Sequence, residues 1–223
     1  MRKKLVCSAL GKYLTGLVLT GLLLFLPAGT LLYPGAWLFI GLMFAPMLIL
    51  GVVLLIKAPE LLEKRLQSGE NESEQKKVAG ITGLLFLAAF VLAGVDFRLG
   101  CTHVPLWLQI AASVLLLLSY GMYAEVMREN AYLSRTVEVQ EGQKVIDTGL
   151  YGIVRHPMYS ATVLLFLSIP LVLGSFIGFA VMLLYPVLLT MRIRNEEKVL
   201  REGLPGYGEY CEKVHWRLMP FIW

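Results

Sequence analysis

Charged residues, cysteines and histidines are all scarce in this sequence. Charged side chains make up 16% of the 223 residues, whereas soluble globular proteins carry about 25%, so the composition argues against a soluble domain. No stripe of basic residues alternates with aromatic ones, which leaves nucleic-acid binding without support. Cys7, Cys101 and Cys211 lie far apart, with no C-x-x-C pair and no histidine at ligand spacing. They therefore indicate neither a disulfide framework nor a zinc site, and we expect no metal.

The sequence is rich in long hydrophobic blocks. Hydrophobic residues make up 57% of the chain and gather in blocks of about 20, the length that a helix needs to cross a hydrocarbon core of roughly 30 Å. The pattern predicts an all-α, polytopic membrane helix bundle in the lipid bilayer. A polar stretch at residues 57–77, with five acidic and five basic residues, predicts a solvated, partly helical loop. The first four blocks predict spans at about residues 10–32, 35–56, 78–95 and 105–122.

The last apolar stretch is too long for one span. It runs from Tyr159 to about Met191, which makes 33 residues. A single helix of that length would measure about 50 Å, more than the bilayer core. Pro170 and the pair Gly174-Ser175 lie near its middle, and both Pro and Gly interrupt helices. We therefore expect a C-terminal helical hairpin that enters the membrane and returns.

Basic residues predict the topology. With the N-terminus on the cytoplasmic side, 19 of the 20 Lys and Arg residues fall in cytoplasmic segments, and only Arg98 lies outside. Since positive charge favours cytoplasmic loops, we expect an integral, multi-pass membrane protein with both termini cytoplasmic. The start at residues 1–4 followed by an apolar run is typical of a signal peptide. Because that run is long and more spans follow, we interpret it as a retained signal anchor.

Two polar clusters flank the predicted hairpin. The first covers residues 149–159, and the second covers residues 192–197 and continues at 206–210. Because a hairpin returns the chain to its starting side, the clusters are expected to meet at the cytoplasmic interface. Pro157 suits the first turn of the entering helix, where backbone N–H groups point toward a bound anion. The sequence thus predicts a candidate site at this end of the hairpin.

Each of these residues also has a purely structural explanation. Arg192 and Glu196 are four residues apart and fit a solvated pair on one helix face. Arg155 and His156 fit a cationic anchor at the membrane interface. Two larger sets fit an interfacial aromatic belt (Tyr151, Tyr159, Tyr207 and Tyr210) and the solvated end of the fourth helix (Glu125, Arg128 and Glu129).

Taken together and in order, these motifs resemble a known family. Gly-Leu-Tyr is followed by Arg-His-Pro-x-Tyr, an apolar hairpin, Arg-x-x-x-Glu-Glu, a Tyr-x-x-Tyr pair and a closing Pro-Phe-Ile. From Gln140 to Ile222, a little over a third of the chain, this order resembles the isoprenylcysteine carboxyl methyltransferases, which are related in pattern to the phospholipid N-methyltransferases. The resemblance implies a four-span N-terminal region at residues 1–124 and a methyltransferase-like region with a cytoplasmic cofactor site at residues 125–223.

The resemblance also implies roles for individual residues. It implies transfer of a methyl group from S-adenosylmethionine to a lipophilic or membrane-associated substrate, with Arg192 meeting a substrate carboxylate and Arg155 at the catalytic centre. Glu196 matches the acid that contacts the cofactor. The full set implied to bind S-adenosylmethionine is Gln143, Lys144, Val145, Ile146, Tyr151, His156, Pro157, Met158, Tyr159, Glu196 and Glu197.

Two departures from the family pattern bear on the pocket. Ala161 stands where the family has Gly, which reduces backbone freedom. Leu204-Pro205-Gly206 replaces the usual Phe-Gly before the tyrosine pair. Neither departure removes a charged group, so the implied cofactor site is retained while the shape of the substrate pocket differs.

The nucleophile can be argued from charge. A carboxylate is already ionised at pH 7 and needs orientation rather than a base, which a guanidinium provides with two-point geometry. An amine would arrive protonated and require a base, for which Glu197 is the one obvious unpaired candidate. We therefore favour a carboxylate or another anionic nucleophile. Aromatic faces of Tyr151 or Tyr159 suit a cationic sulfonium, and the sequence has no G-x-G-x-x-G of a Rossmann site.

Three alternatives remain open. In the first, the chain is a methyltransferase whose acceptor is a phospholipid amine or a small thiol. In the second, it is an NADPH-dependent membrane reductase of the sterol type, a class whose C-terminal region is similar in pattern. In the third, it is a non-catalytic membrane scaffold. The sequence indicates no oligomeric state.

Overall fold

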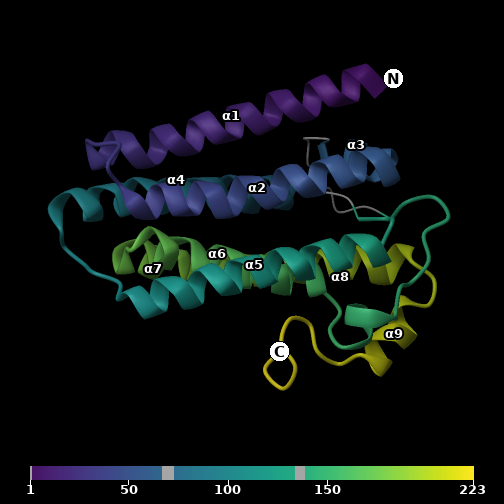
Figure 1. The fold of residues 1–223 in the computed structure, drawn as a ribbon. Coiled ribbons are helices and arrows are strands. Elements are labelled where there is room, and N and C mark those ends of the chain that lie inside the picture. The colour runs from purple at the N-terminus through teal and green to yellow at the C-terminus, as the bar shows by residue number, and fades with distance from the viewer. Residues whose placement is uncertain (1, 67–72, 134–138) are drawn as a thin grey trace.

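The computed structural model describes residues 2–66, 73–133 and 139–223. Within these residues all regular structure is helical and there is no strand, which confirms the predicted all-α membrane bundle. Four long helices cover the predicted spans (Figure 1), namely α1 Arg2–Ala28, α2 Pro34–Lys57, α4 Ser73–Leu99 and α5 Leu106–Glu129.

The C-terminal hairpin is also confirmed. Its entering arm is α6 (Pro157–Leu173), and the chain reverses at Gly174, whose φ of 86° suits glycine. The Ser175 hydroxyl then caps the next helix by accepting a hydrogen bond from the Gly178 amide at 3.0 Å. Two helices form the returning arm, α7 (Phe176–Met182) and α8 (Leu184–Gly203).

The returning arm differs from the prediction in two respects. It is interrupted at Leu183, between α7 and α8, because Pro186 has no amide hydrogen and its ring clashes with the carbonyl group four residues earlier. It also continues to Gly203, well beyond the predicted end at Met191. The polar half of α8 remains helical because its side chains are held by neighbouring segments at the site described below.

Helix ends differ from the predicted spans as well. The first helix begins at Arg2 rather than residue 10, and α5 continues to Glu129 rather than residue 122. A hydrophobic block marks only the part of a helix that contacts lipid, whereas the backbone hydrogen bonds continue into polar residues with good helix propensity. By length and hydropathy, the described residues hold five candidate spans, which are α1, α2, α4, α5 and the segment Phe176–Gly203, with α6 as a shorter apolar helix.

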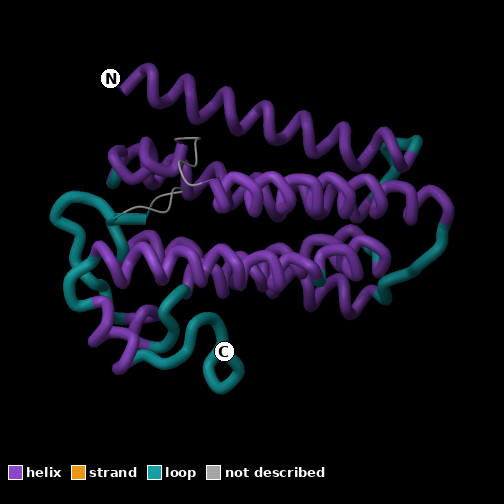
Figure 2. Tube along the Cα trace, turned by 180° about the vertical axis from the view of Figure 1, so that it is seen from behind, coloured by secondary structure: helices purple, strands orange, loops and turns teal. Residues whose placement is uncertain are grey.

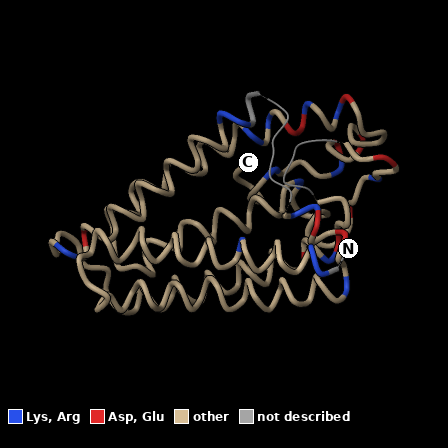
Figure 3. The backbone as a smooth tube through the Cα atoms, turned by 90° about the horizontal axis from the view of Figure 1, so that it is seen from above, with Lys and Arg blue, Asp and Glu red and all other residues tan. Residues whose placement is uncertain are grey.

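Charged residues gather at one end of this bundle, called the charged end here. The start of α1, the short amphipathic α3 (Pro59–Leu66) and α9 (Tyr207–Lys213) all lie there (Figures 1 and 2). Figure 3 shows most Lys, Arg, Asp and Glu residues at the same end, while Asp96 and Arg98 belong to the turn of α4 at the far end. The distribution agrees with the loop charges expected of a membrane protein.

The far end of the bundle is closed by a buried carboxylate. Asp96 is 1% exposed and accepts hydrogen bonds from the Thr102 amide at 2.8 Å and from the Ser175 hydroxyl at 2.5 Å. It thereby connects α4, the following loop and the hairpin turn. Tyr33 strengthens the same region by donating its hydroxyl to the carbonyl of Leu173 at 2.7 Å. The hairpin turn is therefore fixed by side chains from the N-terminal spans.

Close helix packing makes Gly94 a sensitive position. A Cβ atom there would lie 2.7 Å from the Leu24 carbonyl oxygen of α1, and a backbone atom cannot rotate away. We expect Gly94→Ala to separate α1 from α4 and to lower stability by about 1–3 kcal/mol, measured as thermal unfolding in detergent. Gly80→Ala, on the same helix with nothing within 4 Å of the added Cβ, is the matched control. Equal stability of the two variants would contradict this packing.

Candidate functional site

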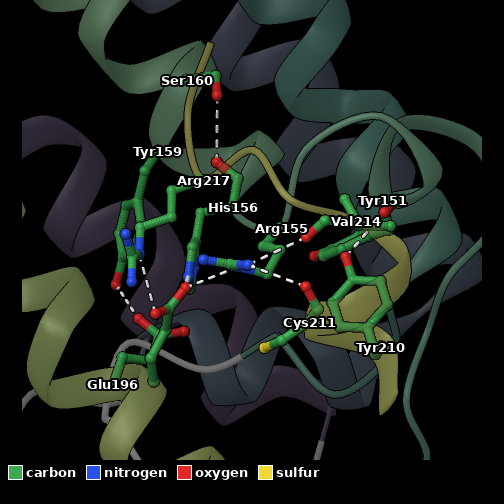
Figure 4. Close-up of polar contacts among 11 residues, drawn as sticks. Tyr151, Arg155, His156, Tyr159, Ser160, Glu196, Tyr210, Cys211, Val214 and Arg217 are labelled. Carbon is green, nitrogen blue, oxygen red and sulfur yellow. Dashed lines mark hydrogen bonds and ion pairs between the residues drawn. The ribbon is translucent and has the colours of Figure 1, made fainter. Parts of the chain in front are cut away.

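The two predicted polar clusters meet at the charged end. The short helix η1 (Gly149–Gly152) leads into α6, and α8 returns beside it from the other arm of the hairpin (Figure 4). The segment between η1 and α6 is held by the C-terminal tail, because the amides of Arg155 and His156 donate to the carbonyls of Trp216 and Arg217 at 2.8 and 2.9 Å. Three stretches that are far apart in sequence thus build one site.

A buried ion cluster lies at the centre of this site. Glu197 is 4% exposed. One of its oxygens, Oε1, lies 2.8 Å from Arg155 Nε and 3.3 Å from His156 Nε2, while Oε2 lies 2.9 Å from Arg217 Nε. The prediction that Glu197 is unpaired, and so available as a base, is therefore wrong. Its partners come from the η1–α6 segment and the tail, which no spacing along α8 could indicate.

Most hydrogen bonds of the Arg155 side chain are made within this cluster and its surroundings. Its side chain is 5% exposed, and Nη1 donates further hydrogen bonds to the carbonyls of Val214 at 3.0 Å and Cys211 at 3.4 Å. Its contacts therefore join the segment before α6 to α8 and to the end of α9 (Figure 4). Arg155 also lines the polar cavity described below.

Tyr159 connects Arg192 with Glu196. Its hydroxyl donates to Glu196 Oε2 at 2.5 Å and accepts from Arg192 Nε at 2.9 Å. Both α8 side chains are partly buried, so the alternative of a solvated i,i+4 pair does not describe them. The ring of Tyr159 also stacks on that of His156, with centroids 5.7 Å apart.

The other three tyrosines that the sequence assigned to an interfacial belt are interior instead. Tyr151, Tyr207 and Tyr210 are all buried. Tyr151 accepts a hydrogen bond from the Asn130 side-chain amide at 2.9 Å, and Tyr210 donates its hydroxyl to the Tyr151 carbonyl at 2.7 Å. Burial raises the pKa of Tyr151 and of Tyr207 above the ordinary value, so both phenols stay protonated at neutral pH.

A cavity of about 110 Å³, called the polar cavity here, opens between η1, α6, α8 and α9. Its wall includes every predicted cofactor-binding residue except Glu197, together with Arg155. Tyr207 belongs to this wall, and its hydroxyl is buried without a hydrogen-bond partner among the described residues. Seven residues outside the predicted cofactor set also line it, namely Asn130, Tyr132, Leu133, Leu200, Leu204, Tyr207 and Tyr210. Of these, the sequence motifs had included Leu204, Tyr207 and Tyr210 without assigning them to the cofactor.

A second and larger cavity, called the apolar cavity here, extends into the bundle. It measures about 810 Å³, within the range of roughly 300–1,000 Å³ that is typical of ligand pockets. Apolar side chains of α2, α4, α5, α6 and α8 form most of its wall, and Arg192 lines it. Met158 and Tyr159 line both cavities, so these two side chains form the partition between them.

Two contributions to the site were missed by sequence reasoning. Arg65 of α3 lines the apolar cavity, donates a hydrogen bond to the Tyr123 hydroxyl, and places Nη1 3.8 Å from the sulfur of Met158. Glu129 is not merely the solvated end of α5, because it accepts the Leu150 amide of η1 at 3.2 Å. By contrast, Glu125 and Arg128 belong to the solvated end of α5, as predicted, where they form an exposed pair at 2.6 Å.

Comparison with known families agrees with the position of the site. The model of the phospholipid methyltransferase (PEMT) family, a family of membrane methyltransferases that includes isoprenylcysteine methyltransferases, matches residues 107–205. The matched range begins in α5 and ends after α8, and it contains most of the polar cavity wall. The tail that holds Arg155 and His156 lies outside it.

Two individual relatives match this chain over only part of their own length. Over 91 residues the chain is 29% identical to the delta(14)-sterol reductase of Mus musculus, a match that covers 40% of this chain and 22% of the mouse protein. Over 97 residues it is 33% identical to the uncharacterized protein YpbQ of Bacillus subtilis strain 168, covering 43% of this chain and 57% of that protein. The chain therefore spans less than two thirds of either relative.

Proposed function

We propose that this chain is an integral membrane methyltransferase that uses S-adenosylmethionine, resembles the protein-S-isoprenylcysteine carboxyl O-methyltransferases, and acts from the cytoplasmic side. The observation that carries the proposal is the partition formed by Met158 and Tyr159 between a polar and an apolar cavity. Such an arrangement allows a polar cofactor and a lipophilic acceptor to approach the same point from two sides. The match to a methyltransferase family over residues 107–205 supports the same chemistry.

The residues of the polar cavity fit S-adenosylmethionine. Glu196 offers a carboxylate to a cationic ligand, Tyr207 offers a buried hydroxyl without a partner, and Val145, Leu200 and Leu204 offer apolar contacts to a purine ring. The cavity of about 110 Å³ is smaller than the roughly 300–1,000 Å³ that encloses most ligands. We therefore expect the loop at residues 139–148 to move outward when the cofactor binds.

S-adenosylmethionine supplies an electrophilic methyl group on a positively charged sulfur. In the protein, Glu196 and the face of Tyr159 provide negative charge and π density for a cation. Arg192, which lines the apolar cavity, orients an anionic acceptor group with its fork of N–H donors. Holding two reactants in line at the partition lowers the barrier, because the entropy of bringing them together is lost on binding and not in the reaction step.

Arg155 and Glu197 have a positioning role in this proposal. Their buried ion pair joins the segment before α6 to α8. It thereby holds His156 and Tyr159 at a fixed distance from Glu196. Arg155 was implied at the catalytic centre, whereas its contacts with Glu197, Cys211 and Val214 indicate that it holds the wall of that centre.

Glu196→Gln tests the cofactor contact. A charge-assisted interaction contributes about 1.5–3 kcal/mol, so we expect the affinity for S-adenosylmethionine to fall by about tenfold or more, measured by calorimetry in detergent. Glu202→Gln, an exposed position on the same helix, serves as the control and should bind normally. An unchanged affinity of the Glu196 variant would remove this carboxylate from the cofactor site.

The reaction itself is tested with membranes that contain the protein and S-adenosylmethionine labelled in its methyl group. We expect label in the lipid-extractable fraction, and release of that label by mild base, because a methylated carboxylate is an ester. Base-stable label would assign the acceptor to an amine or a thiol and would overturn only the carboxylate part of the proposal. No transfer above that of an Arg192→Ala membrane would overturn the methyltransferase proposal.

A membrane reductase is the second candidate function. It is favoured by the identity of 29% to a sterol reductase over 91 residues and by an apolar cavity of about 810 Å³. A reductase of this kind would bind NADPH in the polar cavity. Displacement of bound S-adenosylmethionine by NADPH at comparable concentrations would favour it, whereas no displacement supports the methyltransferase.

A further inference from the structure

The tail after α9 folds into a tight apolar loop at residues 216–223, called the aromatic loop here. Figures 1 and 2 show it running from α9 back along the flank of the bundle. One side of it is attached to the spans, because Leu218 is buried in the same cluster as Val163, Leu189 and Ile193. The Ser160 hydroxyl also donates to the Leu218 carbonyl at 2.6 Å.

Large apolar side chains cover the other side of the loop. Phe221 is 87% exposed and Ile222 is 75% exposed, and Phe221 packs against Trp216 with ring centroids 5.4 Å apart. Full exposure of such side chains to water is unfavourable by about 25 cal/mol for each Å² of apolar surface. This face would therefore be more stable in contact with an apolar phase than with water.

The depth of the loop argues for lipid. Its attachment point, Ser160, is near the start of α6, where the apolar stretch of the hairpin begins. Polar residues of the charged end lie on one side of this level and hydrocarbon-facing residues on the other. At this boundary between headgroups and acyl chains, aromatic side chains are enriched in membrane proteins.

The backbone of the loop is suited to the same environment. The amides of Arg217 and Leu218 both donate to the backbone oxygen of Trp223 at 2.9 Å, and the amides of Ile222 and Trp223 both donate to the Met219 carbonyl at 3.2 Å. Pro220 has no amide hydrogen to satisfy. Non-helical backbone at membrane depth requires such internal hydrogen bonding, since hydrocarbon offers no partners.

We propose that the aromatic loop is an interfacial anchor, with Phe221 and Ile222 inserted between the lipid headgroups and acyl chains of the leaflet at the charged end. Its partner is the lipid surface itself. Because Arg217 contacts Glu197 at 2.9 Å and stacks over Trp223 at 5.1 Å, the anchor is directly connected to the ion cluster of the site. The inference holds whether or not the chain transfers methyl groups.

A spin label reports the surroundings of the loop. Phe221→Cys and, separately, Ile222→Cys are made in a background that carries Cys7→Ser and Cys101→Ser, whereas Cys211 is buried and its residual label is subtracted. The labelled protein is placed in phospholipid nanodiscs, and collision rates with oxygen and with a water-soluble nickel chelate are measured. Two positions calibrate the scale, Val187→Cys on a lipid-facing part of α8, 61% exposed, and Gly208→Cys, exposed on α9.

We expect the ratio of oxygen to nickel collisions at residues 221 and 222 to be several-fold higher than at 208 and close to that at 187. A ratio equal to that at 208 would show that the loop contacts water and would overturn the proposal. Exclusion of both reagents, with an immobilised spectrum, would assign the surface to a protein partner and would overturn it equally. Since two positions are tested, a folding defect in one variant leaves the other decisive.

Discussion

Replacing Arg192 by alanine is expected to lower methyl transfer by about 10²–10³-fold, the usual effect of removing one oriented donor from an active site. Arg192 lines the apolar cavity and reaches the partition through its hydrogen bond to Tyr159, but it does not line the polar cavity. Binding of S-adenosylmethionine should therefore persist. Turnover is measured with methyl-labelled cofactor, and binding by calorimetry in detergent.

Two further substitutions make this test specific. Arg192→Lys keeps the positive charge but loses the planar fork of donors, so its turnover should lie between that of the parent and the alanine variant. Arg194→Ala removes an exposed arginine two residues away on the same helix and should leave turnover and binding unchanged. Loss of cofactor binding in Arg192→Ala would contradict the assignment of this residue to the acceptor side.

Glu197→Gln is expected to have the largest effect on stability. The substitution leaves the buried guanidinium of Arg155 without its counter-charge, and breaking a buried ion pair from one side costs about 3–5 kcal/mol. For a chain of this size the loss corresponds to a decrease in melting temperature of roughly 6–20 °C. Thermal unfolding followed by circular dichroism would measure it, as would a thiol-reactive dye that reports exposure of Cys211 in a background carrying Cys7→Ser and Cys101→Ser, since both of those cysteines are exposed.

The matched control for this prediction is Glu125→Gln. Glu125 also pairs with an arginine, at 2.6 Å, but the two side chains are 42% and 70% exposed. Solvent and salt screen such a pair, so its loss should leave the melting temperature unchanged. Equal behaviour of the two variants would show that the cluster around Glu197 does not hold the site together.

Much of the fold could be predicted because the bilayer imposes simple demands. A span needs about 20 apolar residues, and four such blocks were plain in the sequence. The hairpin followed from Pro170 and Gly174, since a longer helix would not fit the membrane. The break at Leu183 was missed, although Pro186 supplies a local reason for it, because the whole stretch is uniformly apolar and gives no change in pattern.

The site was predicted in part, and the reason lies in the distance between partners. Residues of the polar cavity wall on η1, α6 and α8 belong to dense motifs, and the structure brings them to one cavity. The pairing of Glu197 with Arg217, and of the Arg155 amide with the Trp216 carbonyl, joins segments that carry no mutual signal in sequence. The sequence alone therefore shows which residues are polar and clustered. It does not show which charged residues pair with one another.

We expect S-adenosylmethionine to bind beside Tyr159, in the cavity between the loop at residues 143–146 and α8. Ultraviolet cross-linking of labelled S-adenosylmethionine to the protein in nanodiscs, followed by peptide mapping, tests this location directly. We expect label on peptides within residues 143–159, removed by unlabelled S-adenosylmethionine but not by NADPH. Label confined to residues 2–66, or removed by NADPH instead, would contradict it.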